Sequence, residues 1–85
     1  PPPKPSQLNV SQFFEQVVTL MQAEMAKISA ICTVEVADSL TVMADAALVE
    51  QVLINLLTNS VQALEGQATP HIRLTAKRVG NEVWM

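Results

Sequence analysis

The sequence predicts an α+β fold, a two-layer sandwich in which helices cover one face of a mixed sheet. Apolar residues recur at helical spacing in two segments, 12–29 and 46–64. Segments 32–37 and 71–79 instead alternate apolar with polar residues or are rich in β-branched residues, as strands are. Because helices and strands follow one another without strict alternation, the helices are expected to gather on one side of the sheet.

Composition restricts the classes of protein to which this chain can belong. Its 85 residues suffice for one small domain or part of one. Only 15% of them are charged, whereas about a quarter are charged in a typical soluble domain. Because 49% are apolar, either the apolar faces pack very efficiently or some of them meet chain that this sequence does not contain. The net charge of -3 and the lack of a basic run give no indication of nucleic-acid binding.

The sequence indicates a cytoplasmic location. It contains no apolar stretch near the roughly 18 residues of a membrane span and no secretory signal. Its one cysteine, Cys32, cannot form an internal disulfide, which fits a reducing compartment. No second Cys or His lies nearby in the sequence, so we expect Cys32 to be a small buried side chain and not a metal ligand. Anchoring of a parent protein in the inner membrane stays open.

The first part of the chain predicts a linker, a short strand and a long helix. Residues 1–6, "PPPKPS", are proline-rich and indicate the end of a linker, so we place the domain at 7–85. "QLNV", residues 7–10, favours a short strand, and Ser11 is a good N-cap for a helix over 12–29. The apolar stripe of this helix comprises Phe13, Val17, Leu20, Met21, Met25 and Ile28.

Two short strands and a second helix are predicted next. "CTVEVA", residues 32–37, and "TVMA", residues 41–44, have the composition of strands. Asp45 is placed to cap a helix over 46–64, and Gly66 follows where a helix C-cap is expected.

The last part of the chain predicts a hairpin. Residues 71–79, "HIRLTAKRV", alternate as a half-exposed strand does. "GN" at 80–81 favours a tight turn of type II′, because glycine comes first. "EVWM", residues 82–85, begins another strand, and Trp84 and Met85 are expected in the core.

The second helix carries neutral polar side chains on one face. At 100° per residue, a set of six falls within about 120°: Gln51, Asn55, Thr58, Asn59, Gln62 and Glu65. Solvated helix faces normally carry Glu, Lys and Arg, yet Glu50 is the only charged residue between Ala46 and Leu64. Each interior asparagine also costs about 0.5 kcal/mol relative to alanine. An ordinary solvated face stays open, but these features favour a binding role.

Asn55 and Asn59 are the candidate binding pair, because residues four apart project side by side on a helix. A carboxamide oxygen can ligate a hard cation such as Mg²⁺, and its NH₂ group can donate to phosphate oxygens. The group is neutral, so it repels neither a polyphosphate nor a metal. The pair can therefore hold one metal ion and the phosphate chain attached to it.

The segment "DAALVEQVLINLLTNSVQAL" resembles the N-box of the histidine-kinase catalytic domain, an ATP-binding module with the Bergerat fold that gyrase and MutL share in outline. The family pattern is an acidic residue, Leu, Gln-Val-Leu, Asn-Leu-Leu and Asn-Ser. This chain matches it at Asp45, Leu48, 51–53, 55–57 and 59–60. The flanking elements follow the family order too, so the resemblance covers nearly the whole chain.

The resemblance implies roles for three side chains. Asn59 is expected to bind the Mg²⁺ that bridges the phosphates of ATP, and Asn55 to support the metal or the phosphates. Gln62 stands where many relatives have a lysine, so it is expected near the nucleotide without a cationic contact to phosphate. "NSVQAL" is most similar to the nitrogen-regulation and dicarboxylate-sensing kinases.

The implied function is that of a two-component sensor histidine kinase, which transfers the ATP γ-phosphate to a histidine in a separate dimerisation domain and works with a response regulator. The family's glycine-rich adenine and phosphate motifs are missing, since the only glycines are Gly66 and Gly80. We therefore expect a partial Bergerat fold without its C-terminal half, inactive by itself. His71 opens a strand and is expected at the surface, not as the phospho-acceptor.

Other functions stay open. A non-catalytic protein-interaction module on a degenerate kinase-like scaffold would use the same elements. A gyrase-like or chaperone ATPase would need a catalytic glutamate where this chain has Asn55, and the missing carboxylate favours transfer over hydrolysis. A sheet left open at Met85 is expected to let copies of the chain associate through its edge.

Overall fold

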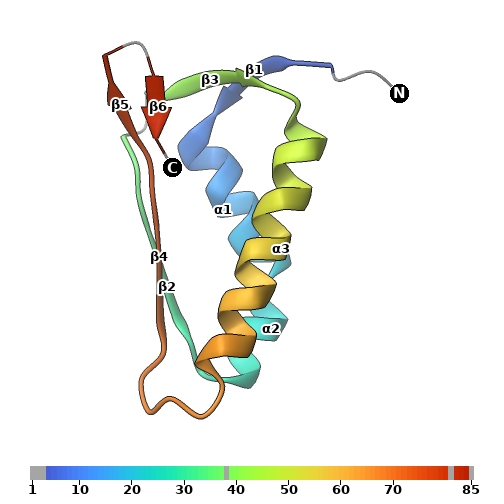
Figure 1. Cartoon of the computed structure of the whole chain (residues 1–85), viewed down its shortest axis with the longest axis vertical. Helices are drawn as coiled ribbons and strands as arrows, with labels where there is room; N and C mark the ends of the chain where they lie inside the picture. The colour runs from blue at the N-terminus through green and yellow to red at the C-terminus, as the bar shows by residue number, and fades with distance from the viewer. Residues whose placement is uncertain (1–3, 38, 81, 85) are drawn as a thin grey trace.

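A computed structural model describes residues 4–37, 39–80 and 82–84. Within these ranges the elements are β1 (Ser6–Asn9), α1 (Val10–Leu20), α2 (Gln22–Lys27), β2 (Ile31–Glu35), β3 (Thr41–Ala44), α3 (Ala46–Leu64), β4 (His71–Thr75), β5 (Lys77–Val79) and β6 (Glu82–Trp84). The helices form one layer, β2 and β4 run along the other, and β1 and β3 cross one end (Figure 1). The predicted α+β fold with helices on one face of a mixed sheet is confirmed.

The strands pair in both directions. β2 and β4 are parallel, with Ile31 opposite His71 and Glu35 opposite Thr75. β1 pairs with β3, and β5 with β6, in antiparallel fashion. Backbone hydrogen bonds divide these strands into two-stranded units, so among the described residues β4 has β2 as its single neighbour.

The first helix begins earlier than the sequence predicts, and Ser11 is not its N-cap. Asn9 is the cap, since its Oδ1 accepts a hydrogen bond from the backbone N–H of Gln12 at 3.0 Å. Asparagine and serine cap helices about equally well, so local preference does not separate them. Packing does, because Val10 is fully buried and its N–H donates to the carbonyl of Leu40 at 3.0 Å. The predicted strand at 7–10 is accordingly displaced to Ser6–Asn9.

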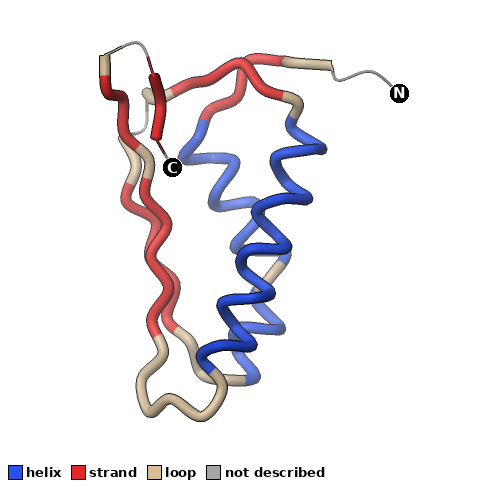
Figure 2. Tube along the Cα trace, viewed as in Figure 1, coloured by secondary structure: helices blue, strands red, loops and turns tan. Residues whose placement is uncertain are grey.

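The predicted helix over 12–29 is two helices, separated at Met21 (Figure 2). The N–H of Met21 is shared between the carbonyls of Val17 and Val18, both at 3.1 Å. Just before it, the Thr19 hydroxyl donates to the carbonyl of Glu15 at 2.9 Å, a contact that commonly bends helices. The bend keeps Met21 buried while α2 continues beside α3.

The strand predictions need smaller corrections. The strand placed at 32–37 runs from Ile31 to Glu35. The strand placed at 71–79 is interrupted at the buried Ala76, where the chain leaves β2 as its partner and begins to pair with β6.

Two expectations at the C-terminus fall partly outside the described residues. Gly80 has φ +62°, as a tight hairpin turn requires, and Val79 faces Glu82 across it, but Asn81 lies outside the described residues. The expected core positions of the Trp84 side chain and of Met85 lie outside them too.

The predicted strand at 41–44 and helix at 46–64 are confirmed to the residue. The helix C-cap is Glu65, and Gly66 follows it with φ +85°. Glu65 has φ -56° and ψ 132°, and the N–H of Gln67 bonds to the carbonyl of Leu64 at 3.0 Å. These values describe a type II turn, in which the third position requires a positive φ. Gly66 therefore serves the turn that ends the helix.

The core lies between the helices and the β2–β4 pair. Its most deeply buried side chains are Phe14, Leu57, Val10 and Val17. Phe13 is also buried, at 4% exposure, so both phenylalanines pack α1 inside the domain. Leu57 and Val61 are the buried residues of α3, and they fix which face of that helix turns outward.

Candidate functional site

Helix α3 starts at a carboxylate that makes three hydrogen bonds. Oδ1 of Asp45 accepts the backbone N–H groups of Ala47 and Leu48 at 3.0 and 3.2 Å, which confirms the predicted cap. Oδ2 accepts the N–H of Lys4 at 2.9 Å. The N–H of Lys4, followed by those of Leu48 and Ala47, holds the pKa of Asp45 below its usual value.

Opposite the buried residues, α3 presents what we call the amide face. All six of its side chains are exposed: Gln51, Asn55, Thr58, Asn59, Gln62 and Glu65. The structure therefore brings the three predicted site residues, Asn55, Asn59 and Gln62, together on one surface of one helix.

The two asparagines differ in their hydrogen bonds. Oδ1 of Asn55 accepts a hydrogen bond from Nε2 of Gln51 at 3.3 Å. That contact orients the Asn55 amide and leaves its NH₂ group as the free donor. The amide of Asn59 makes no hydrogen bond within the described part of the chain, so both its oxygen and its NH₂ group are available to a ligand.

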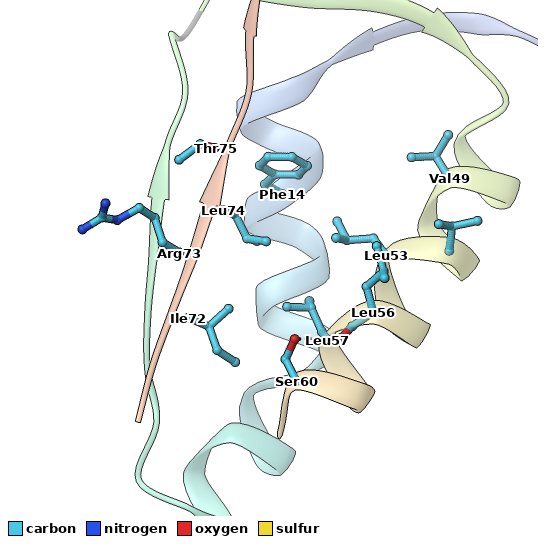
Figure 3. Close-up of a pocket in the computed structure, with 11 residues that line it drawn as sticks. Phe14, Val49, Leu53, Leu56, Leu57, Ser60, Ile72, Arg73, Leu74 and Thr75 are labelled. Carbon is cyan, nitrogen blue, oxygen red and sulfur yellow. Dashed lines mark hydrogen bonds between the residues drawn. The ribbon is translucent and has the colours of Figure 1, made fainter. Parts of the chain in front are cut away.

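A groove lies on one side of the amide face, between α3 and β4. It has a volume of about 500 Å³ and is lined mainly by apolar side chains. Val49, Leu53 and Leu56 form the helical wall, Ile72 and Leu74 the wall on β4, and Phe14 lies between them (Figure 3). Its volume lies within the range of small-molecule pockets.

A second hollow borders the other side of the amide face, between α3 and the α1–α2 bend. It is lined by Thr58, Gln62 and Glu65 from α3 and by residues including Leu20 and Lys27. The Nζ of Lys27 lies 3.3 Å from the carboxylate of Glu24, so the cation beside this hollow is already paired. Asn55 and Asn59 thus stand on a ridge between two hollows.

The described residues offer no metal site made of charged ligands alone. Among residues 4–37, 39–80 and 82–84, no three His, Cys, Asp or Glu side chains are close enough together to hold a metal ion. A cation at the amide face would therefore have neutral protein oxygens and would need anionic ligands from a bound molecule. Mg²⁺ commonly takes such ligands from substrate phosphates.

Two other residues weighed from the sequence lie away from this site. His71 is exposed, as expected, and its ring contacts the hydroxyl of Thr33 on the outer face of β2 and β4. Cys32 is half-buried on β2, and burial, followed by the nearby charge of Glu15, raises the pKa of its thiol. In the described part of the chain, no helix is long and apolar enough to cross a membrane.

Sequence reasoning did not find the groove or the apolar side chains that flank it. Leu48, Val52 and Leu56 are 55%, 58% and 57% exposed. Their spacing of four residues sets them in one row along α3, and that spacing was the signal available in the sequence. The sequence alone does not show that this row borders a groove, because the other wall of the groove is formed by β4.

Comparison with known proteins gives a match in structure. No protein-family model matches the chain, and no curated protein matches its sequence. The nucleotide-free catalytic domain of the histidine kinase ThkA aligns with a TM-score of 0.83 and 25% identity, over 94% of this chain and 52% of that one. ThkA in complex with the response regulator TrrA aligns with a TM-score of 0.80 and 25% identity, over 93% and 23%.

A third similar structure extends the likeness in fold. The histidine kinase AdeS of Acinetobacter baumannii aligns with a TM-score of 0.79 and 15% identity, over 94% of this chain and 39% of that one. The chain has the fold of histidine-kinase catalytic domains, and it spans about half the length of the ThkA catalytic domain that it matches.

Proposed function

We propose that this chain is the N-terminal portion of the ATP-binding catalytic domain of a two-component sensor histidine kinase. Two observations support the proposal. The fold is that of histidine-kinase catalytic domains, and α3 exposes a row of neutral amides at the position where the sequence resembles the N-box. The parent protein would transfer the γ-phosphate of ATP to a histidine in a separate dimerisation domain.

The single observation that carries the proposal is the pairing of Asn55 and Asn59. They are four residues apart and both are exposed. Their amides differ in which groups remain free to bind a ligand. Asn59 has an unengaged oxygen suited to Mg²⁺, whereas Asn55 is held by Gln51 and offers an NH₂ donor suited to phosphate. Gln62, one turn further along, adds a neutral donor and acceptor beside them.

The donor set fits Mg²⁺ that arrives with a nucleotide. Bound there, the metal would neutralise the phosphate charge, and the chain's contribution would be positioning. Because no charged ligand cluster is present among the described residues, the amides alone are expected to bind free Mg²⁺ weakly. Metal and ATP should therefore bind together.

The partners and location follow from the same proposal. ThkA has been solved in complex with a response regulator, which supports a response regulator as a partner of this chain's parent. We propose that the domain lies in the cytoplasm, whether or not the parent protein is anchored in the inner membrane. Since the chain spans about half of the matched domain, we propose that it is inactive by itself and binds nucleotide weakly.

A non-catalytic interaction module is the second candidate, and the exposed row Leu48, Val52 and Leu56 favours it. Apolar side chains that are more than half exposed on the same helix suit contact with another polypeptide. The two candidate functions predict different results, because only a kinase domain should bind a metal–nucleotide complex at the amide face.

Paramagnetic broadening of side-chain amide signals tests the proposal directly. Mn²⁺ replaces Mg²⁺ in such sites, and it broadens the NMR signals of nearby groups. With ATP and Mn²⁺ added, we expect selective broadening of the NH₂ signals of Asn55, Asn59 and Gln62. The NH₂ signal of Gln16, an exposed amide on α1, serves as the internal control.

The broadening of the NH₂ signals should require both ATP and Mn²⁺. It should be lost in the Asn59→Ala variant and kept in the Gln16→Ala variant. Equal broadening of Gln16 and Asn59, or broadening by Mn²⁺ that does not depend on ATP, would contradict a metal–nucleotide site at the amide face. Calorimetry adds a second check, because micromolar affinity of these 85 residues for Mg-ATP would refute the proposed weak binding.

A further inference from the structure

The amide face contains a hydrogen bond between two of its own side chains. Nε2 of Gln51 donates to Oδ1 of Asn55 at 3.3 Å, across one turn of α3. Side chains on a helix tilt toward its N-terminus, so the Asn55 amide lies over the turn that contains Gln51 and not over the turn that contains Asn59. The contact therefore follows from the helix geometry and the four-residue spacing.

Along α3, Gln51 has one polar side chain within reach. Residues three and four apart are the neighbours on a helix surface, and for Gln51 these are Ala47, Leu48, Ile54 and Asn55. Three of the four are apolar. The Gln51 amide can therefore pair with Asn55 and with no other side chain of its own helix.

The direction of this hydrogen bond decides which end of Asn55 can meet a ligand. A carboxamide has an oxygen that accepts and an NH₂ group that donates. Because the Asn55 oxygen accepts from Gln51, the NH₂ group is the end that stays free. If the bond ran the other way, Asn55 would offer its oxygen, which suits a metal ion but repels the oxygens of a phosphate.

Asn59 complements this arrangement one turn further along. Its amide makes no hydrogen bond within the described residues, so its oxygen is free to bind a cation. Asn55 and Asn59 together then offer a donor and an acceptor side by side, as a phosphate oxygen and the cation attached to it require. One protein oxygen is sufficient here, because Mg²⁺ keeps several waters and takes few protein ligands when phosphates bind it too.

We propose that Gln51 is a positioning residue for nucleotide binding. Through its hydrogen bond to Oδ1, it makes Asn55 the donor to phosphate and leaves Asn59 as the metal ligand of the pair. This inference rests on the proposed function, since it concerns how the amide face divides phosphate and metal between its two asparagines. Gln51 itself touches neither group.

The orientation of the Asn55 amide can be measured in the whole chain without any ligand. Hydrogen exchange followed by NMR should be about twofold slower for the NH₂ group of Gln51 than for that of Gln16, an exposed amide on α1. The NH₂ group of Asn55 should exchange as fast as that of Gln16. Gln51→Glu should slow the NH₂ group of Asn55, because a carboxylate can only accept. A slowed NH₂ group of Asn55 in the wild type would overturn the inference.

Titration with ATP, with and without Mg²⁺, tests the division of roles. Backbone amide shifts of α3 follow even weak binding. In EDTA, Asn55→Ala should weaken ATP binding about fivefold or more, because it removes a hydrogen bond to a charged group. Asn59→Ala should have most of its effect only when Mg²⁺ is present. A larger effect of Asn59→Ala than of Asn55→Ala in EDTA would overturn the assignment of phosphate to Asn55.

A double variant tests whether Gln51 acts through Asn55. Gln51→Met keeps the length of the side chain but removes its polar end, and it should weaken ATP binding about twofold, as expected for an exposed pair of amides one turn apart. This loss should disappear in the Asn55→Ala background. Gln16→Met is the matched control and should leave the affinity for ATP unchanged in both backgrounds.

The possible failures can be told apart. A loss of affinity on Gln51→Met that persists in the Asn55→Ala background, or that equals the effect of Gln16→Met, would overturn the positioning role alone. An Asn59 signal that ATP and Mn²⁺ do not broaden would overturn the proposed function, and this inference with it, even where Gln51 orients Asn55 as expected.

Discussion

The backbone N–H of Lys4 donates a hydrogen bond to Oδ2 of Asp45 at 2.9 Å, across 41 residues of sequence. The other oxygen of the same carboxylate caps α3. One side chain therefore ties the entry of the chain to the first turn of the helix that carries the amide face. Asn9 plays the corresponding part at the other end of β1, where it caps α1.

The contribution of Asp45 to stability should depend on pH. Its pKa is lowered in the folded state by the N–H of Lys4 and then by those of Leu48 and Ala47. A carboxyl with a lowered folded pKa stabilises the fold fully above its unfolded pKa of about 3.9, and this is lost as pH falls through the folded value. We expect the stability difference between the wild type and Asp45→Asn to shrink in that window, as measured by urea unfolding at several pH values.

Glu65→Gln is the control for this experiment, because it removes the same charge at the other end of α3. Comparison of the two variants separates the loss of one negative charge from the chain as a whole from the loss of a charge at the N-terminal end of α3. A difference between wild type and Asp45→Asn that stays constant as the solution is acidified would show that the three hydrogen bonds do not favour the ionised form.

Two neighbouring leucines should respond very differently to truncation. Leu57 is 2% exposed, whereas Leu56 is 57% exposed. Leu57→Ala leaves a cavity in the core and should cost about 2–5 kcal/mol, but Leu56→Ala should cost only about 0.5 kcal/mol. Urea unfolding at low protein concentration measures both. Similar losses for the two variants would mean that α3 is rotated from the orientation described here.

Helix α3 was predictable to the residue because independent local signals agree on it. The apolar period runs from Ala46 to Leu64, Asp45 supplies the cap, and Gly66 supplies the turn that follows. The same 100° spacing also predicted which side chains share the amide face. Local rules suffice there, since every residue involved lies on one helix.

The errors arise where tertiary packing decides between local options of equal quality. Asn9 and Ser11 cap helices about equally well, and the burial of Val10 selects Asn9. The strand over 71–79 is continuous in its pattern but changes its pairing partner at Ala76. The groove could not be found at all from the sequence, because it requires β4 beside α3, and the register that places β4 is a long-range property.

Gly66 should be intolerant of a side chain for a conformational reason alone. Its φ is +85°, and a Cβ built there meets nothing within 4 Å. Gly66→Ala should therefore cost about 1–2 kcal/mol of backbone strain without a steric clash. Thermal unfolding should show a smaller loss for Gly66→Asn, because asparagine tolerates this region better than alanine. Equal stability of wild type and Gly66→Ala would contradict the type II turn.

Asn59→Ala should stabilise the fold in the absence of any ligand. Asn59 is exposed in the interior of α3 and its amide has no hydrogen-bond partner within the described residues, so alanine should gain about 0.5 kcal/mol from helix propensity alone. Asn55→Ala is the matched comparison, and its gain should be smaller, because it also removes the hydrogen bond from Gln51. Urea unfolding at low protein concentration measures both differences.

The sign of this result bears on why the asparagine is there. A side chain whose removal strengthens the helix is not retained for stability, and a stability gain combined with loss of Mn²⁺–ATP broadening would assign Asn59 to ligand binding. A lower stability for Asn59→Ala would instead give the residue a structural part, and the amide face would then be no different from an ordinary solvated helix face.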